Sequence, residues 1–172
     1  MDSRPAGITD YFAATQIIHQ SSGCVIAVWQ DISIGIWRRS ATLPLVLELE
    51  NVRDHISKRY PKTSSIHVIV DDAGLPEPDA RAKLEEITTA SEARLIAVAT
   101  VLTGSGFRTS AIRGFLTSVH WLKRRPYHAR VCGSIREAVE WLAPLHAACS
   151  VATDPSALEH LIVQLCERPS VT

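Results

Sequence analysis

The chain has 172 residues, of which 46% are hydrophobic and 21% charged, a balance that suits one globular domain with a substantial core. Eighteen Lys and Arg side chains match eighteen Asp and Glu side chains, so no net charge draws the protein to nucleic acid or to an acidic membrane. The first ten residues lack a signal-peptide pattern, and no apolar run approaches the roughly 18 residues that span a bilayer. We therefore expect a cytoplasmic protein with no membrane span and no nucleic-acid partner.

Short extended segments begin the predicted domain. Residues 1–14 are predicted to form a flexible N-terminal segment. Two apolar runs, Thr15–His19 and Cys24–Gln30, flank the turn-forming residues 20–23, which predicts a β-hairpin. The isoleucines within Ile32–Ile36 alternate with Ser33 and Gly35, which predicts another extended piece.

A rhythm of helices and strands follows. Apolar residues at helical spacing after Pro44 predict a helix that ends before Tyr60 and Pro61. Three predicted strands come next: Ser65–Val70, Arg94–Leu102 and His128–Cys132. Four predicted helices come with them: Asp79–Ala93, Phe107–Lys123, Ile135–Leu142 and Ser156–Cys166. Ser134 and Glu137 have the spacing of a capping box, and Asp154 with Pro155 is typical of a helix start.

This order predicts an α/β fold in which a mixed β-sheet is packed with helices. We expect one domain over residues 15–150 and a C-terminal helical extension over residues 151–172. The sheet core should contain the side chains of Val68, Val70, Ile96 and Val98.

Metal or cofactor chemistry is not indicated. Cys24, Cys132, Cys149 and Cys166 show no ligand spacing and are interpreted as small reduced core residues. The seven histidines do not cluster, and His67 is interpreted as a hydrogen-bonded core residue. We predict no metal, no cofactor and no catalytic residue.

Two strand-to-helix loops, residues 71–78 and 103–108, should lie on one edge of the sheet, where ligands and partners of open α/β sheets bind. In the first loop, Asp71 and Asp72 could hold magnesium or share a proton. Adjacent residues of a strand point to opposite sides, however, so an Asx-type turn into Gly74 explains them as well.

The second loop, with Thr103, Ser105 and Arg108, could present backbone amides to an anion. It matches neither a Walker A loop nor a dinucleotide fingerprint, and Ser105 is equally well explained as a helix N-cap.

Basic residues recur in the second half of the chain and could bind phosphate or an acidic partner. Three of them, residues 123–125, are at the end of a predicted helix, where cations complement the helix dipole in any case. They are Arg108, Arg113, Lys123, Arg124, Arg125 and Arg130.

The loop after the predicted strand Ser65–Val70 resembles the corresponding loop of STAS domains, the bacterial anti-sigma-factor antagonist fold. In that family an Asp-Ser-Ser-Gly-Leu-like loop carries a serine that a partner kinase phosphorylates. Here Asp71, Gly74 and Leu75 match the loop, whereas Asp72 and Ala73 occupy the two serine positions. The resemblance implies a phosphorylation switch that is lost or moved, with Asp72 as a permanent negative charge.

By element order the resemblance covers roughly Thr15–Leu142, and the region from Gly104 through Tyr127 is also similar to uncharacterised bacterial STAS-like proteins. It implies a non-enzymatic regulatory or scaffold module that binds a protein partner through the strand-to-helix edge. Two alternatives stay open: a module for a small anionic ligand or lipid head group, and an enzyme using Asp71 or Asp72. Self-association is a further hypothesis, because the apolar stripe of Ser156–Cys166 must be buried on this chain or on another.

Overall fold

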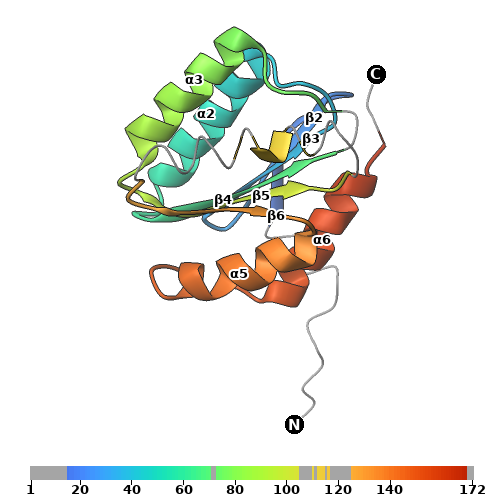
Figure 1. Cartoon of the computed structure of the whole chain (residues 1–172). Coiled ribbons are helices and arrows are strands. Elements are labelled where there is room, and N and C mark those ends of the chain that lie inside the picture. The colour runs from blue at the N-terminus through green and yellow to red at the C-terminus, as the bar shows by residue number, and fades with distance from the viewer. Residues whose placement is uncertain are drawn as a thin grey trace.

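The computed structural model describes residues 15–70, 73–104, 110, 112–114, 116 and 125–169. Its centre is one six-stranded mixed sheet whose strands lie in sequence order (Figure 1). The strands are β1 (Thr15–Gln20), β2 (Cys24–Trp29), β3 (Ile32–Trp37), β4 (Thr63–Ile69), β5 (Leu95–Leu102) and β6 (His128–Cys132). Strands β1 to β3 form an antiparallel meander, and β3 to β6 run parallel to one another. The predicted α/β class with a mixed sheet is therefore confirmed.

One face of the sheet is covered by α2 (Leu43–Ser57) and α3 (Pro78–Ser91). These helices connect successive parallel strands, and right-handed crossovers that advance in one direction place their helices on the same face. Each helix has a proline at its first or second residue, Pro44 in α2 and Pro78 in α3, where the missing N–H would have no partner within the helix. The buried residues of α2 recur at helical spacing: Val46, Leu49, Val52 and Ile56.

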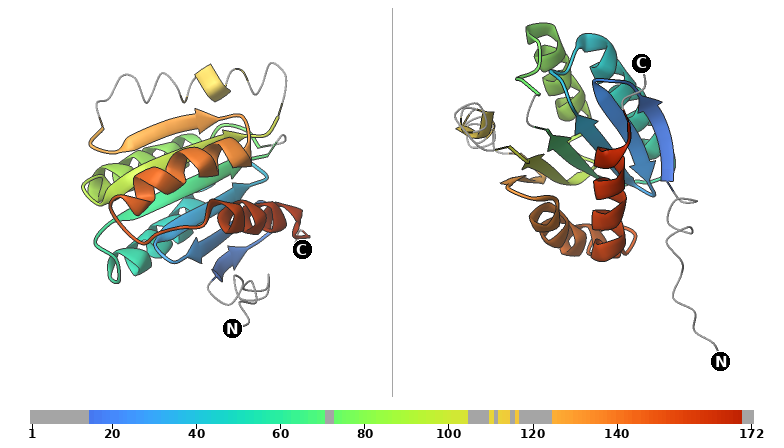
Figure 2. Two further views of the ribbon diagram at one scale, coloured as in Figure 1. Left: turned by 90° about the horizontal axis from the view of Figure 1, so that it is seen from below. Right: turned by 90° about the vertical axis from the view of Figure 1, so that its right-hand side faces the viewer.

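The opposite face is covered by α5 (Ile135–Ala147) and α6 (Pro155–Glu167), seen from below in Figure 2. The Ser134 side chain caps α5 by accepting a hydrogen bond from the Glu137 backbone N–H. The Glu137 carboxylate accepts the Gly133 N–H rather than that of Ser134, so the predicted capping box is only half formed. The helix also runs five residues beyond its predicted end, through Pro144, which lies in the last turn.

Helix α6 packs back onto the sheet. Leu158, Leu161, Ile162 and Leu165 are at most 2% exposed and belong to the core cluster beneath β2 to β5. Arg38, directly after β3, donates hydrogen bonds to the carbonyls of Leu165, Cys166 and Arg168 and so ties down the C-terminal end of the helix. The apolar stripe is buried on this chain, so it no longer supplies a reason for self-association.

Side chains alternate between the two faces along each strand, as the pleat requires. On β3, Ile32, Ile34 and Ile36 belong to the core beneath α5 and α6. Ser33 and Trp37, on the α2/α3 side, are buried as well. Both faces of the central strands are thus covered.

Two burial predictions are wrong. Val68, Ile96 and Val98 are buried, but Val70 is only partly buried because β4 ends one residue earlier, at Ile69. All four cysteines are free, yet Cys149 is exposed, because it follows the C-cap of α5. Among the described residues, no helix combines the length and apolar character that crossing a bilayer requires.

Candidate functional site

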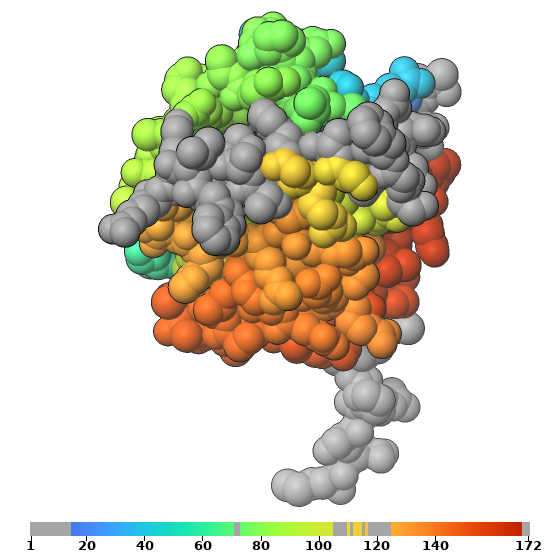
Figure 3. All heavy atoms as spheres, viewed as in Figure 1, coloured from blue at the N-terminus to red at the C-terminus, as the bar shows by residue number. Residues whose placement is uncertain are grey.

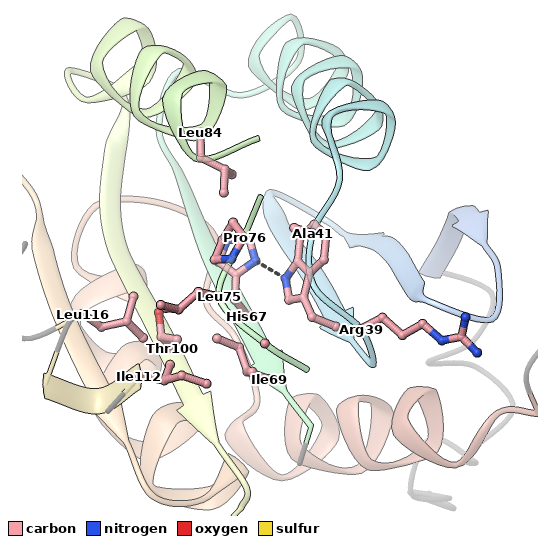
Figure 4. A pocket seen from close by; sticks show the side chains of 12 residues that line it. Arg39, Ala41, His67, Ile69, Leu75, Pro76, Leu84, Thr100, Ile112 and Leu116 are labelled. Atoms are coloured by element: carbon pink, nitrogen blue, oxygen red, sulfur yellow. Dashed lines mark hydrogen bonds between the residues drawn. The ribbon is translucent and has the colours of Figure 1, made fainter. Parts of the chain in front are cut away.

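A cleft opens on the α2/α3 face, between α3 and the helical residues Ile112 and Leu116 (Figure 4). Its outer half has a volume of about 140 Å³ and reaches the loop after β4 through Gly74, Leu75 and Pro76. Figure 4 shows Leu84 pointing down into it from α3, while the Arg39 side chain runs away from the other labelled residues. The lining of this half is therefore mainly apolar.

The floor of the cleft carries one polar pair. The Trp37 indole Nε1–H donates a hydrogen bond of 3.2 Å to His67 Nδ1, drawn as the dashed line in Figure 4. Because Nδ1 accepts, the ring proton of neutral His67 lies on Nε2. Burial and the positive charge of Arg53 lower the pKa of His67 from 6.5 to about 3, so the ring is neutral at physiological pH. His67 is hydrogen-bonded, as predicted, but it is only partly buried and lines the cleft, so its interpretation as a core residue is wrong.

Gly35 makes this pair possible. It lies opposite His67 in the parallel register of β3 and β4. A Cβ at Gly35 would lie 2.9 Å from both His67 Nδ1 and Trp37 Nε1. A Cβ atom essentially never comes that close to another heavy atom, so glycine is required for the indole and the imidazole to meet.

The inner half of the cleft has a volume of about 240 Å³ and shares His67, Pro76, Leu84, Thr100 and Leu116 with the outer half. Typical ligand pockets measure roughly 300–1,000 Å³, so each half by itself suits only part of a small molecule. Arginine side chains concentrate here, in contrast to the outer half. The inner lining includes Arg53 of α2, Arg81 of α3, Arg125 and the Tyr127 ring.

Arg53 has buried donors without acceptors. Its Nε and Nη1 are shielded from solvent and have no hydrogen-bond partner, although the residue as a whole is partly exposed. Burial lowers the pKa of the Arg53 guanidinium to about 10, an effect that Tyr127 partly opposes. The group is therefore still positively charged near pH 7.

Arg125 contributes a second cation. Its side chain is only 10% exposed, and its Nη1 lies 3.6 Å from Glu92 Oε2, so the pair is an ion pair at long range. Its Nε is buried and has no hydrogen-bond partner. Arg125, predicted as a surface cation, is thus turned inward to the cleft. Arg130, another member of the predicted basic group, is ion-paired with Glu137.

The other predicted site residues divide into two groups. Gly74 lines the outer half of the cleft, and Thr103 Oγ1 donates to the Ile69 carbonyl next to it. Six predicted site residues lie outside the described part of the chain: Asp71, Asp72, Ser105, Arg108, Lys123 and Arg124. In the part of the chain that is described, no three His, Cys, Asp or Glu side chains are placed to hold a metal ion.

The sequence analysis missed Trp37, Arg53 and Tyr127. Arg53 directly follows Val52 in an amphipathic helix. An arginine next to the buried stripe of such a helix is usually expected to be exposed to solvent. The sequence pattern around Trp37 was informative, because Trp37 shares one face of its strand with Ser33 and Gly35. A large aromatic residue next to small residues on one strand face indicates that its ring covers them.

A second polar cluster lies on the opposite face, and its members are fully buried except Ser150, which is partly exposed. His146 Nε2 is 2.9 Å from Asp31 Oδ1, His146 Nδ1 is 2.8 Å from Ser64 Oγ, and Ser150 donates to Asp31 Oδ2. Burial alone would raise the pKa of Asp31, but hydrogen bonds from His146 and Ser150 and the charge of His146 outweigh it and lower that pKa.

The set contains a serine, a histidine and an aspartate, the residue types of a hydrolytic triad. Ser64, His146 and Asp31 are each 0% exposed, and none of them lines the cleft. Their contacts join the β2–β3 turn, β4 and the end of α5. These hydrogen bonds hold the three elements together.

Comparison with known proteins adds no assignment. The chain has no significant match among protein-family models, curated proteins or solved structures.

Proposed function

We propose that the protein is a non-enzymatic binding module that takes a small, largely apolar molecule into the cleft between α3 and the sheet. The observation that carries this proposal is the continuity of the two halves of the cleft, which share five lining residues. A preformed concave site with an apolar lining and a few converging polar groups is the usual form of a small-molecule site. The small-ligand alternative raised by the sequence is therefore favoured over a flat scaffold surface.

Binding rather than catalysis is supported by the polar groups of the cleft. Among the described residues, His67 hydrogen-bonds to the Trp37 indole, which is no nucleophile, and its low pKa removes it from proton transfer near pH 7. A hydrolytic or acid–base site needs a nucleophile and a base in hydrogen-bond contact. That contact is absent from the described lining.

Binding is tested with 1-octanol, a neutral apolar probe, followed by ¹H–¹⁵N NMR of the tryptophan indoles. The Trp37 indole signal should move with saturation, because Trp37 lines the cleft. Trp29 is an internal control, since it lies in the core cluster on the opposite face, and its signal should stay in place.

A matched pair of variants locates the probe. Leu84→Asp places a carboxylate in both halves of the cleft and should abolish the Trp37 shift. Leu47→Asp changes a leucine of α2 that is 41% exposed and outside the cleft, and should leave the shift intact. Equal movement of both indoles, or none at saturating probe, would refute the proposal.

A second candidate is the protein-binding module that the STAS resemblance implies. It is favoured by Leu75, a large apolar side chain that is 38% exposed in the loop after β4, at the mouth of the cleft. A photo-crosslinking residue at Leu75, introduced in the native cells, should then give one discrete protein adduct. The same residue at Val151, which is 39% exposed on another part of the surface, should give none. Identical adduct patterns at both positions would exclude a partner at this loop.

A further inference from the structure

We propose that the inner half of the cleft is an oxyanion site, so that the natural ligand is an amphiphile with a carboxylate or phosphate held at Arg53 and Arg125. The apolar part of the ligand then lies in the outer half, against Leu75, Leu84 and Ile112. The inference rests on the proposed function and names the chemical class of its ligand.

The first argument is the set of unmatched donors. Among the described residues, eight buried side-chain atoms have no hydrogen-bond partner, and three of them, Arg53 Nε, Arg53 Nη1 and Arg125 Nε, belong to side chains that line the inner half. Native proteins satisfy almost all buried donors, and an exception calls for an explanation. An oxyanion offers several acceptor lone pairs to such donors and forms charge-assisted bonds with guanidinium groups.

The second argument is the local charge. Three arginines and one glutamate line the inner half: Arg53, Arg81, Arg125 and Glu85. Glu92 pairs with Arg125 from outside the lining. Arginines therefore outnumber glutamates among the described residues that line the inner half. An anionic group suits this lining.

The third argument is convergence of the groups. The charges of Arg125 and Arg53 both act on the Tyr127 hydroxyl, and that of Arg53 also acts on His67. Two cations, a phenol and the imidazole therefore face one space, although the residues come from α2, β4 and the segment before β6. Like charges are brought together at a cost to stability, which binding of an anion would offset.

The fourth argument is the division of the cleft. His67 and Thr100 stand on the sheet floor where the two halves meet, and the outer half beyond them is mainly apolar (Figure 4). A molecule with one charged end and one apolar end matches this polarity. A highly charged or wholly polar ligand would leave the outer half without a matching group.

The test compares three probes with the same alkyl chain: 1-octanol, octanoate and octyl phosphate. Binding to the full-length protein is measured by the Trp37 indole shift and by calorimetry at pH 7. Octanoate or octyl phosphate should bind about ten- to a hundredfold tighter than octanol, as expected for charge-assisted hydrogen bonds. The tighter of the two anions identifies the oxyanion.

Variants of Arg53 test the assignment of the site. Arg53→Met should lose most of the preference for the anion while octanol affinity stays within about threefold. Its melting temperature should equal or exceed that of the wild type, because an unmatched buried charge is removed. Arg53→Lys should keep part of the preference. Arg136→Gln removes an exposed cation on the opposite face and should keep all of it.

The outcomes separate the two proposals. Octanol binding with no gain for either anion would leave the cleft as a binding site and overturn the oxyanion site. An anion preference that persists in a folded Arg53→Met protein would overturn it as well. If none of the three probes moves the Trp37 signal, the proposed function and this inference both fail.

Discussion

Two sets of buried polar groups, one on each face of the sheet, differ in whether they have hydrogen-bond partners. Beneath α5 and α6, His146 and the Asp31 carboxylate sit in an apolar core, and each has close partners among Ser64, Ser150 and one another. Beneath α2 and α3, Arg53 and Arg125 have buried N–H groups without acceptors. Figure 3 shows α3 above and α5 below on one side of the molecule.

A satisfied buried network stabilises the fold, whereas an unsatisfied one destabilises it and is retained where function needs it. The Asp31–His146 network is therefore structural, and the arginine-lined part of the cleft is available for binding. Trp29 Nε1, in the core beneath α5 and α6, is also buried and has no hydrogen-bond partner among the described residues. This contrast predicts that comparable substitutions in the two sets change the free energy of unfolding differently.

The largest expected effect comes from the enclosed network. His146→Ala leaves the Asp31 carboxylate buried without its main partner and should lower the free energy of unfolding by about 3–5 kcal/mol. Arg53→Met removes a basic side chain from the other face and should leave the free energy of unfolding unchanged or raise it slightly. Urea denaturation monitored by circular dichroism measures both. A loss below about 1 kcal/mol for His146→Ala would contradict the contrast between the faces.

A pair of leucines extends the comparison to apolar packing. Leu161 of α6 is 2% exposed in the core, so Leu161→Ala should cost about 2–5 kcal/mol. Leu84 only partly packs against the core and lines the cleft, so Leu84→Ala should cost about 1 kcal/mol or less and weaken octanol binding instead. Equal losses of stability would show that the cleft is packed as tightly as the core.

The smallest expected effect is a pH dependence that originates in the cleft. His67 has a pKa of about 3 in the folded protein and 6.5 as an unperturbed side chain, so between these values the unfolded chain binds the extra proton. Stability is complete above about pH 6.5 and falls as the pH decreases, by about 2 kcal/mol at pH 5.

The pH effect is measured by urea denaturation at pH 7 and pH 5. His67→Gln removes the titrating ring and should flatten the dependence over this range. The lowered pKa of Asp31 acts in a different window, because its contribution is lost only as the pH falls below the unperturbed value of 3.8. An unchanged slope in His67→Gln would assign the effect to another group.

The local pattern of the chain was enough to predict the class of fold and most of its elements. Strand β6 begins and ends at the predicted residues, and β5 and α6 differ from the predicted ranges by one residue at one end or at both. These elements carry strong local signals: continuous β-branched runs, helical spacing and capping residues such as Ser134 and Asp154. Even so, Pro144 would have ended α5 too early in any local interpretation.

The candidate site could not be derived in the same way. The sequence pattern predicted a site in the loops after two strands, and of the described residues in those loops Gly74, Leu75 and Pro76 line the cleft while Thr103 lies beside it. The groups that distinguish the cleft, Trp37, Arg53 and Tyr127, are separated by 90 residues of chain from first to last. Each has an ordinary local explanation as a strand or helix residue.

The sequence by itself thus determined the order of strands and helices, because periodicity and capping act over a few neighbouring residues. Only the tertiary structure decided which polar groups are left without partners. His146 lies in the buried stripe of α5 and Arg53 lies next to that of α2, but the neighbouring residues in sequence do not show which of the two has a partner. The difference arises because packing brings the Asp31 carboxylate to the first and places the second beside another arginine, an imidazole and a phenol.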